Sequence, residues 1–148
     1  METHPDFRDL LESFNRHEVD YVIVGGYALA FHGAPRFTGD MDIFVRPDPR
    51  NAQRILDALA DFGFASPDLA VEDFVALDKV VQLGVAPVRV DLLTSVTAVT
   101  WEEAQSGRAC GTYGDVPVHY IGREQFIANK RACGRKKDLA DLEALGEG

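Results

Sequence analysis

Hydrophobic and polar residues follow two different periods along the chain. Near the N-terminus, apolar residues recur every three or four positions, which predicts an amphipathic helix over residues 6–17. Further on, short uninterrupted apolar runs are bounded by glycine, proline or aspartate, a pattern typical of buried strands. These runs predict strands over residues 21–24, 41–45, 80–85, 88–93, 109–113 and 116–121.

Helical periodicity returns between and after these runs. It predicts helices over residues 26–32, 49–62 and 100–108, and two more within 122–148. Asp48 suits the cap of the helix that begins at Pro49, and Gly134 separates the two closing helices. The last two strands fit a hairpin, because Gly114 and Asp115 form a strong turn pair. The segment 71–77 fits either a strand or a short helix.

This interleaving predicts an α+β (mixed α/β) protein, in which helices flank a central sheet without a regular βαβ alternation. With 148 residues, 46% apolar and 26% charged, we expect one domain over 1–148. It divides into an N-terminal helix (1–20), a sheet core (21–121) and closing helices (122–148). No apolar run is long enough to span a membrane, and the N-terminus lacks the parts of a signal peptide.

Composition and charge narrow the class of protein further. The two cysteines, Cys110 and Cys133, form neither a disulfide framework nor a zinc spacing, so we expect reduced thiols in a cytoplasmic protein. A net charge of −9 argues against binding nucleic acid over a broad surface. One basic segment, 130–137, holds five cations in eight residues. It fits equally well a solvated helix end and a phosphate-binding patch.

Carboxylates interrupt two of the predicted strands. Asp40 and Asp42 are two positions apart, so they lie on one side of the strand and repel each other unless a positive group compensates. An Asp-x-Asp pair alone is more often structural than functional. Asp91 interrupts the strand at 88–93, and a buried acid there needs a partner. That partner is either a cation such as Arg89 or a metal ion shared with the other two acids.

A glycine pair, Gly25-Gly26, lies between the first strand and the short helix that follows it, and it permits close approach of a polyanion to the backbone. If the strand with Asp91 pairs with the strand after Asp40, the three carboxylates converge. Three carboxylates can hold two Mg²⁺ ions about 3.5–4 Å apart, with Mn²⁺ as an alternative, and promote in-line phosphoryl displacement. Asp91 could then accept the proton of the attacking hydroxyl.

The order of these features resembles the DNA polymerase beta-like nucleotidyltransferase superfamily. That family has an apolar strand, a Gly-Gly or Gly-Ser turn, a short helix, Asp-x-Asp on a strand and a third acid on a later strand. The chain is most similar to the small bacterial branch, which includes minimal nucleotidyltransferases and abortive-infection type toxins. The supporting segments are Arg36-Phe-Thr38-Gly-Asp40-Met-Asp42, Asn129-Lys130-Arg131, Gly134-Arg135, Lys137-Asp138 and Asp141.

The resemblance implies a nucleotidyltransferase fold and a role for each matching residue. It implies that Asp40, Asp42 and Asp91 are the catalytic and metal-binding acids. It implies that the nucleotide and its phosphates are bound by Gly25, Gly26, Arg36, Thr38, Lys130, Arg135 and Lys137. Lys130 would be the main phosphate-neutralising lysine, Arg36 would hold either a phosphate or the acid pair, and Asp138 and Asp141 would be structural.

The activity that the resemblance implies is transfer of a nucleoside monophosphate from an NTP to a hydroxyl, with release of pyrophosphate. The acceptor could be a tRNA 3′ end, a protein side chain or a small molecule, and the protein could be the toxin of a toxin–antitoxin pair. A cognate antitoxin or a second copy would then be its partner. The alternatives are a catalytically silent nucleotide-binding or toxin–antitoxin interaction module and, with less support, a metal-dependent hydrolase or nuclease. The complete set of acids favours the enzyme.

Overall fold

The computed structural model describes residues 3–35, 38–64, 66–85 and 88–147. Six helices, six strands and one 3₁₀ segment follow each other in these ranges, close to the positions predicted from the pattern. In chain order they are α1 (Pro5–Arg16), β1 (Tyr21–Val24), α2 (Gly25–Phe31), β2 (Met41–Val45), α3 (Pro49–Phe62), η1 (Val71–Phe74), β3 (Val80–Val85), β4 (Val88–Leu93), α4 (Trp101–Gly107), β5 (Ala109–Tyr113), β6 (Val116–Tyr120), α5 (Arg123–Cys133) and α6 (Lys136–Ala144).

The six strands form one mixed sheet in the order β3-β4-β2-β1-β6-β5. The pairs β2·β4 and β1·β6 are parallel, and the other neighbours are antiparallel. The α+β class with a central mixed sheet is therefore confirmed. The ambiguous segment at 71–77 contains the 3₁₀ turn η1 and no strand.

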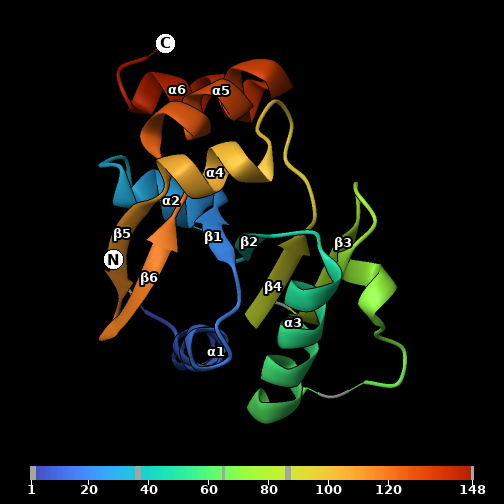
Figure 1. The fold of residues 1–148 in the computed structure, drawn as a ribbon. Coiled ribbons are helices and arrows are strands. Elements are labelled where there is room, and N and C mark those ends of the chain that lie inside the picture. The colour runs from blue at the N-terminus through green and yellow to red at the C-terminus, as the bar shows by residue number, and fades with distance from the viewer. Residues whose placement is uncertain (1–2, 36–37, 65, 86–87, 148) are drawn as a thin grey trace.

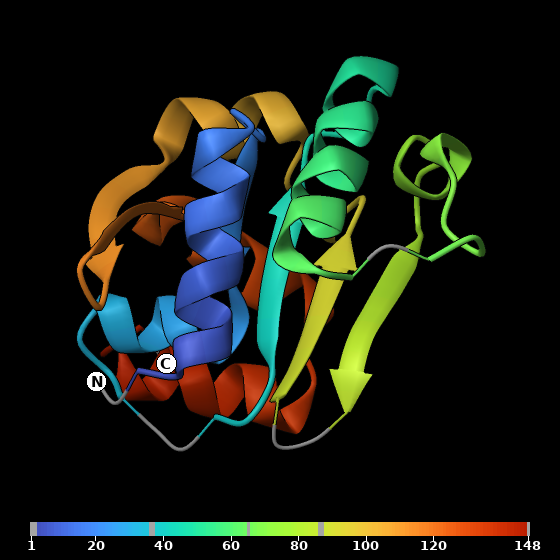
Figure 2. The ribbon, with the colours of Figure 1, turned by 90° about the horizontal axis from the view of Figure 1, so that it is seen from below.

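Helices cover both faces of the sheet. Helices α1 and α3 lie together on one face, where Figure 2 shows them in front of the strands. Helices α4, α5 and α6 lie on the opposite side, above β1 and β6 in Figure 1. Within the part of the chain that the structure describes, no helix is both long and apolar enough to cross a membrane.

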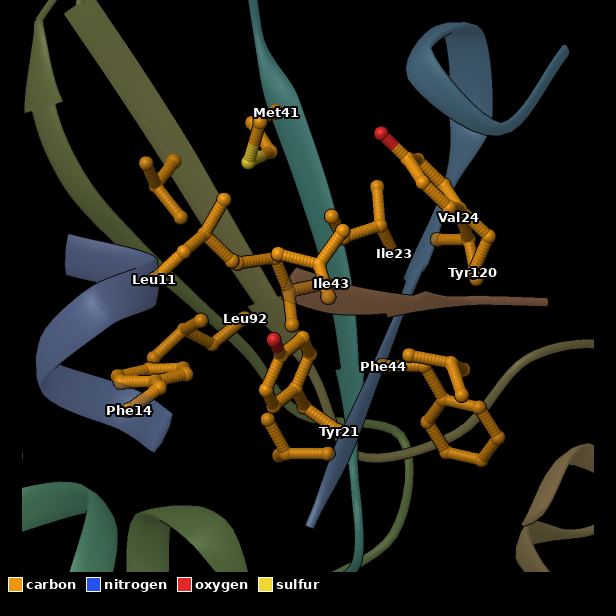
Figure 3. Packing of buried hydrophobic residues seen from close by; sticks show 14 of the residues in the cluster. Leu11, Phe14, Tyr21, Ile23, Val24, Met41, Ile43, Phe44, Leu92 and Tyr120 are labelled. Carbon is orange, nitrogen blue, oxygen red and sulfur yellow. The ribbon is translucent and has the colours of Figure 1, made fainter. Parts of the chain in front are cut away.

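The core lies mainly between the sheet and α1. Figure 3 shows Leu11 and Phe14 of α1 on the same side of the sheet as Ile43 and Leu92, and all four are fully buried. Phe44 points to the opposite side, where its ring packs edge-on against Trp101 of α4 with 5.2 Å between ring centroids. Strand β2 is thus packed on both faces at Ile43 and Phe44, and Asp42 beside them is partly buried.

A buried asparagine connects the ends of β1 and β2 to α3. The Asn51 side chain donates hydrogen bonds to the carbonyl oxygens of Asp20 (3.0 Å) and Arg46 (3.0 Å), and it accepts one from the backbone N–H of Asp20 (2.7 Å). Its own N–H donates to the Asp48 carboxylate that caps α3. Asn51, which is only 1% exposed, therefore satisfies three backbone groups at the ends of β1 and β2.

Replacing Asn51 by alanine should destabilise the fold strongly. The Asn51→Ala variant leaves the three backbone groups without these partners, so we expect the free energy of unfolding to fall by roughly 2–4 kcal/mol in urea titrations. Gln53→Ala is the matched control, since this residue is on the same helix but exposed, and its effect should stay within about 0.5 kcal/mol. Equal effects of both substitutions would contradict the role assigned to Asn51.

Candidate active site

The parallel pairing of β2 with β4 brings two of the predicted acids side by side. Asp42 is opposite Asp91 in the register, and Met41 is opposite Val90. Because residues in register on adjacent strands share a face, Met41 and Val90 are directed to the core and the two acids to the other face. The pairing on which the predicted convergence depended is therefore present.

Burial and mutual repulsion act on Asp42. Burial, followed by the charges of Asp91 and Asp40, raises the pKa of Asp42 to about 6, although Lys130 and Lys137 oppose the shift. Asp91 is only 8% exposed, whereas the Asp40 side chain is 43% exposed at the edge of the site. The three carboxylates thus interact electrostatically, and an added cation would relieve their repulsion.

The glycine pair fits against the segment that carries these acids. Gly25 has a φ of +68°, and a Cβ placed there would be 2.6 Å from an oxygen of Asp42. A Cβ on Gly26 would be 2.6 Å from the Thr38 hydroxyl. The sequence predicted that the missing side chains admit a polyanion. In the structure, Asp42 and Thr38 use that space, so the glycines are needed to seat the acid-bearing strand.

Of two further predicted site residues, Thr38 and Arg36, the structure describes only Thr38. Thr38 lies beside the glycine turn and donates a hydrogen bond to the Asp40 carbonyl oxygen over 3.3 Å, which fixes the backbone just before β2. Arg36 lies outside the described residues, so its role stays a prediction.

A cation that was considered only as an alternative partner of Asp91 joins two of the acids. Arg89 donates from Nε to Asp91 Oδ1 and from Nη2 to Asp91 Oδ2, each over 3.1 Å. The same Nε is 3.7 Å from Asp40 Oδ2. Its position two residues before Asp91 on β4 indicates that both share a face. Arg89 and Asp40 are 49 positions apart, so no local pattern in the sequence predicts their contact.

The acids suit a hard divalent cation by their chemistry. Carboxylate oxygens are the ligands that Mg²⁺ prefers, and burial together with the charges of Asp91 and Asp40 raises the pKa of Asp42. Among the described residues, however, no group of three or more His, Cys, Asp or Glu is arranged to hold a metal ion. Arg89 lies against Asp40 and Asp91 instead, so the three carboxylates would have to rearrange to enclose an ion. Metal binding stays a prediction.

The predicted phosphate-neutralising lysine lies between the two closing helices. Lys130 is 7% exposed, and its Nζ is 3.2 Å from Asp138 and 3.6 Å from Asp141. Burial alone would raise the pKa of Asp138, but hydrogen bonds from Arg135 and Lys130 outweigh burial and lower the pKa to about 2. These ion pairs give Asp138 and Asp141 the structural role that was predicted for them.

The remaining cations of segment 130–137 differ in their surroundings. Arg135 donates from Nε to Asp138 over 2.7 Å, and Arg131 lies 3.6 Å from Glu147. Lys137 is exposed, and its charge lowers the pKa of Asp42. The basic segment therefore both joins α5 to α6 and places positive charge near the acids. Its binding to phosphate stays a prediction.

An apolar cavity lies on the other face of the sheet. It is bounded by α1, α3 and the β3–β4 pair and lined mainly by Phe7, Leu10, Leu59, Phe62, Leu83 and Val90. Since Val90 and Asp91 alternate on β4, this cavity is separated from the acids by the sheet. It does not extend the candidate site.

Two solved structures that share this fold are described as a nucleotidyltransferase and an adenylyltransferase. A Thermotoga maritima protein assigned as a nucleotidyltransferase has a TM-score of 0.64 at 16% identity, with 96% of this chain and 93% of that chain covered. The lincosamide antibiotic adenylyltransferase LnuA, solved with lincomycin bound, has a TM-score of 0.59 at 16% identity, with 97% and 96% covered. At this identity the similarity shows the fold alone. No curated protein matches by sequence.

A family model matches the sequence itself. It is described as "Nucleotidyl transferase AbiEii toxin, Type IV TA system" and covers residues 8–105, which is 98 of the 148 residues. The matched range includes the glycine pair, the three acids and Arg89, and ends before the closing helices. The fold, the paired acids and this match agree, and the chain belongs to the AbiEii family of nucleotidyl transferase toxins.

Proposed function

We propose that this protein transfers a nucleoside monophosphate from an NTP to a hydroxyl group and releases pyrophosphate, in a reaction that requires Mg²⁺. The observation that carries the proposal is the register of β2 and β4, which sets Asp42 beside Asp91 on one face. The glycine turn at Gly25 adjoins the same carboxylate. Family membership supports nucleotidyl transfer as the reaction class.

The proposed reaction balances as a single displacement. The acceptor oxygen bonds to the α-phosphorus, the bond between that phosphorus and the α,β-bridging oxygen breaks, and pyrophosphate leaves with the electron pair. Mg²⁺ held by Asp40, Asp42 and Asp91 would offset phosphate charge and favour ionisation of the acceptor hydroxyl. We propose that Asp91 accepts the hydroxyl proton. Because Arg89 occupies both oxygens of Asp91 in this structure, that role requires the guanidinium to move.

The remaining cations would bind and orient the nucleotide. Lys137 is exposed and acts electrostatically on Asp42, which supports a contact with the phosphates. Lys130 and Arg135 have carboxylate partners, so we propose that they assist by holding the closing helices near the acids. Gly25, Gly26 and Thr38 would shape the turn that faces the phosphates, and Arg36 is proposed to bind a phosphate or the acids.

The biological role follows from the family. We propose that the protein is the toxin of a toxin–antitoxin pair and that a cognate antitoxin limits its effect, because the family model describes such toxins. A tRNA 3′ end, a protein hydroxyl and a small molecule are all proposed acceptor classes. The net charge of −9 favours acceptors that need only a small basic contact area.

Label transfer tests the proposed reaction. With α-³²P-labelled NTPs, Mg²⁺ and a cell extract, the parent protein should label RNA, protein or a small molecule, and chelation of Mg²⁺ should abolish labelling. Asp42→Asn and Asp91→Asn should each lower the rate by about 100-fold or more, since each removes a proposed metal ligand. Asp61→Asn, an exposed acid on α3, is the control and should transfer like the parent. Nucleotide binding without transfer would favour the silent module, and equal transfer by all variants would contradict the assigned site.

The charge of Asp42 should cost stability when no metal is present. Its pKa is about 6 in the folded protein against a usual value of 3.8, so the folded state holds the proton more tightly and stability falls as pH rises between these values. In EDTA near pH 7.5, we expect the free energy of unfolding of Asp42→Asn to exceed that of the parent by roughly 1–3 kcal/mol. Near pH 4 the difference should largely disappear.

Urea titrations at both pH values measure this effect. Asp40→Asn is the matched control, and its gain should be smaller because the Asp40 side chain is 43% exposed. A loss of stability for Asp42→Asn at both pH values would show that the carboxylate stabilises the metal-free fold and would contradict the proposed repulsion.

A further inference from the structure

Arg89 is the only cation with an ion pair to any of the three acids among the residues that the structure describes. It meets Asp91 through two hydrogen bonds of 3.1 Å and Asp40 at 3.7 Å. Its side chain is 36% exposed, whereas that of Asp91 is 12% exposed. The guanidinium therefore lies at the outer edge of the acid cluster and bridges its exposed and its buried member.

Two other cations near the acids already have carboxylate partners. Lys130 is held by Asp138 and Asp141, and Arg135 by Asp138. The hydrogen bonds to Asp91 raise the pKa of Arg89 above its already high value, so this side chain is a permanent cation at any physiological pH. The acid cluster thus carries its own fixed counter-charge, on the strand that supplies Asp91.

We propose that Arg89 is a positioning residue that substitutes for the divalent cation in the metal-free protein and competes with that cation for Asp91 and Asp40. This inference rests on the proposed function, because it concerns the metal that the transfer reaction would use. Arg89 keeps the repelling acids in place before the metal binds. It leaves Asp91 when the metal binds, which frees both carboxylate oxygens for the ion and for the hydroxyl proton.

The competition follows from charge and from ligand geometry. A guanidinium that donates to both oxygens of a carboxylate occupies the side from which a metal ion would approach. A monovalent and a divalent cation a few ångströms apart also repel each other strongly where water is partly excluded. Among the described residues, no three His, Cys, Asp or Glu side chains are placed to hold a metal ion. This agrees with a site in which Arg89 occupies the position of the cation. Arg89 thereby determines the metal concentration at which the site becomes occupied.

The test uses Mn²⁺ as the probe, without nucleotide, on the full chain. Arg89→Gln removes the charge and keeps a polar side chain of similar length. In EDTA its melting temperature should fall by about 2–4 °C, because the acids lose their counter-charge. Its affinity for Mn²⁺, measured by calorimetry, should rise roughly tenfold or more, because the competing cation is gone. Arg89→Lys keeps the charge and should return the Mn²⁺ affinity most of the way to that of the parent.

Arg46 provides a matched control. Its side chain is 44% exposed and also joins two acids, Asp20 at 3.5 Å and Asp48 at 2.8 Å, beyond the opposite end of β2 from Asp40. Arg46→Gln should lower the melting temperature to a similar extent and leave the Mn²⁺ affinity unchanged. This variant separates a general loss of an ion pair from competition at the acids.

The outcomes distinguish this inference from the proposed function. An Arg89→Gln variant that binds Mn²⁺ no more tightly than the parent overturns the competition, even if the parent transfers label from NTPs. Binding of Mn²⁺ by Arg89→Gln but not by the parent supports it. If neither protein binds Mn²⁺, the competition and the metal dependence of the proposed reaction both fail.

Discussion

The repulsion between carboxylates on one face of the sheet is the constraint on which the rest of this structure depends. Asp42 and Asp91 are in register on parallel strands, and the apolar packing around β2 limits the water that could screen them. Burial and the charges of Asp91 and Asp40 together raise the pKa of Asp42. Such an arrangement costs stability, so a fold that retains it needs positive charge nearby or a ligand that brings it.

Two groups of side chains supply that positive charge. Arg89 reaches the acids directly from the strand of Asp91. The closing helices supply it at longer range: Lys130, fixed by Asp138 and Asp141, and the exposed Lys137 both lower the pKa of Asp42. The helices α5 and α6 thus have an electrostatic effect on the site, although the family model ends at residue 105.

Much of the fold could be predicted from the sequence because its signals are local. Apolar runs between turn residues located the six strands, and Asp48 marked the start of α3. The three acids were recognisable because each interrupts an apolar strand or precedes one. The contacts that join distant segments were not predictable: Arg89 with Asp40, Lys130 with Asp141, and the Asp42 oxygen in the space beside Gly25. They depend on tertiary distances that no local pattern encodes.

The most direct test of the central claim is an anomalous diffraction map from crystals soaked with Mn²⁺ and an NTP analogue whose α,β-bridging oxygen is replaced by a methylene group. The account predicts a Mn²⁺ peak at about 2.0–2.3 Å from oxygens of Asp42 and Asp91, with the triphosphate beside the Gly25-Gly26 turn and Arg89 turned away from Asp91. A nucleotide bound elsewhere, or Mn²⁺ that does not contact these acids while Arg89 keeps both hydrogen bonds to Asp91, would contradict it.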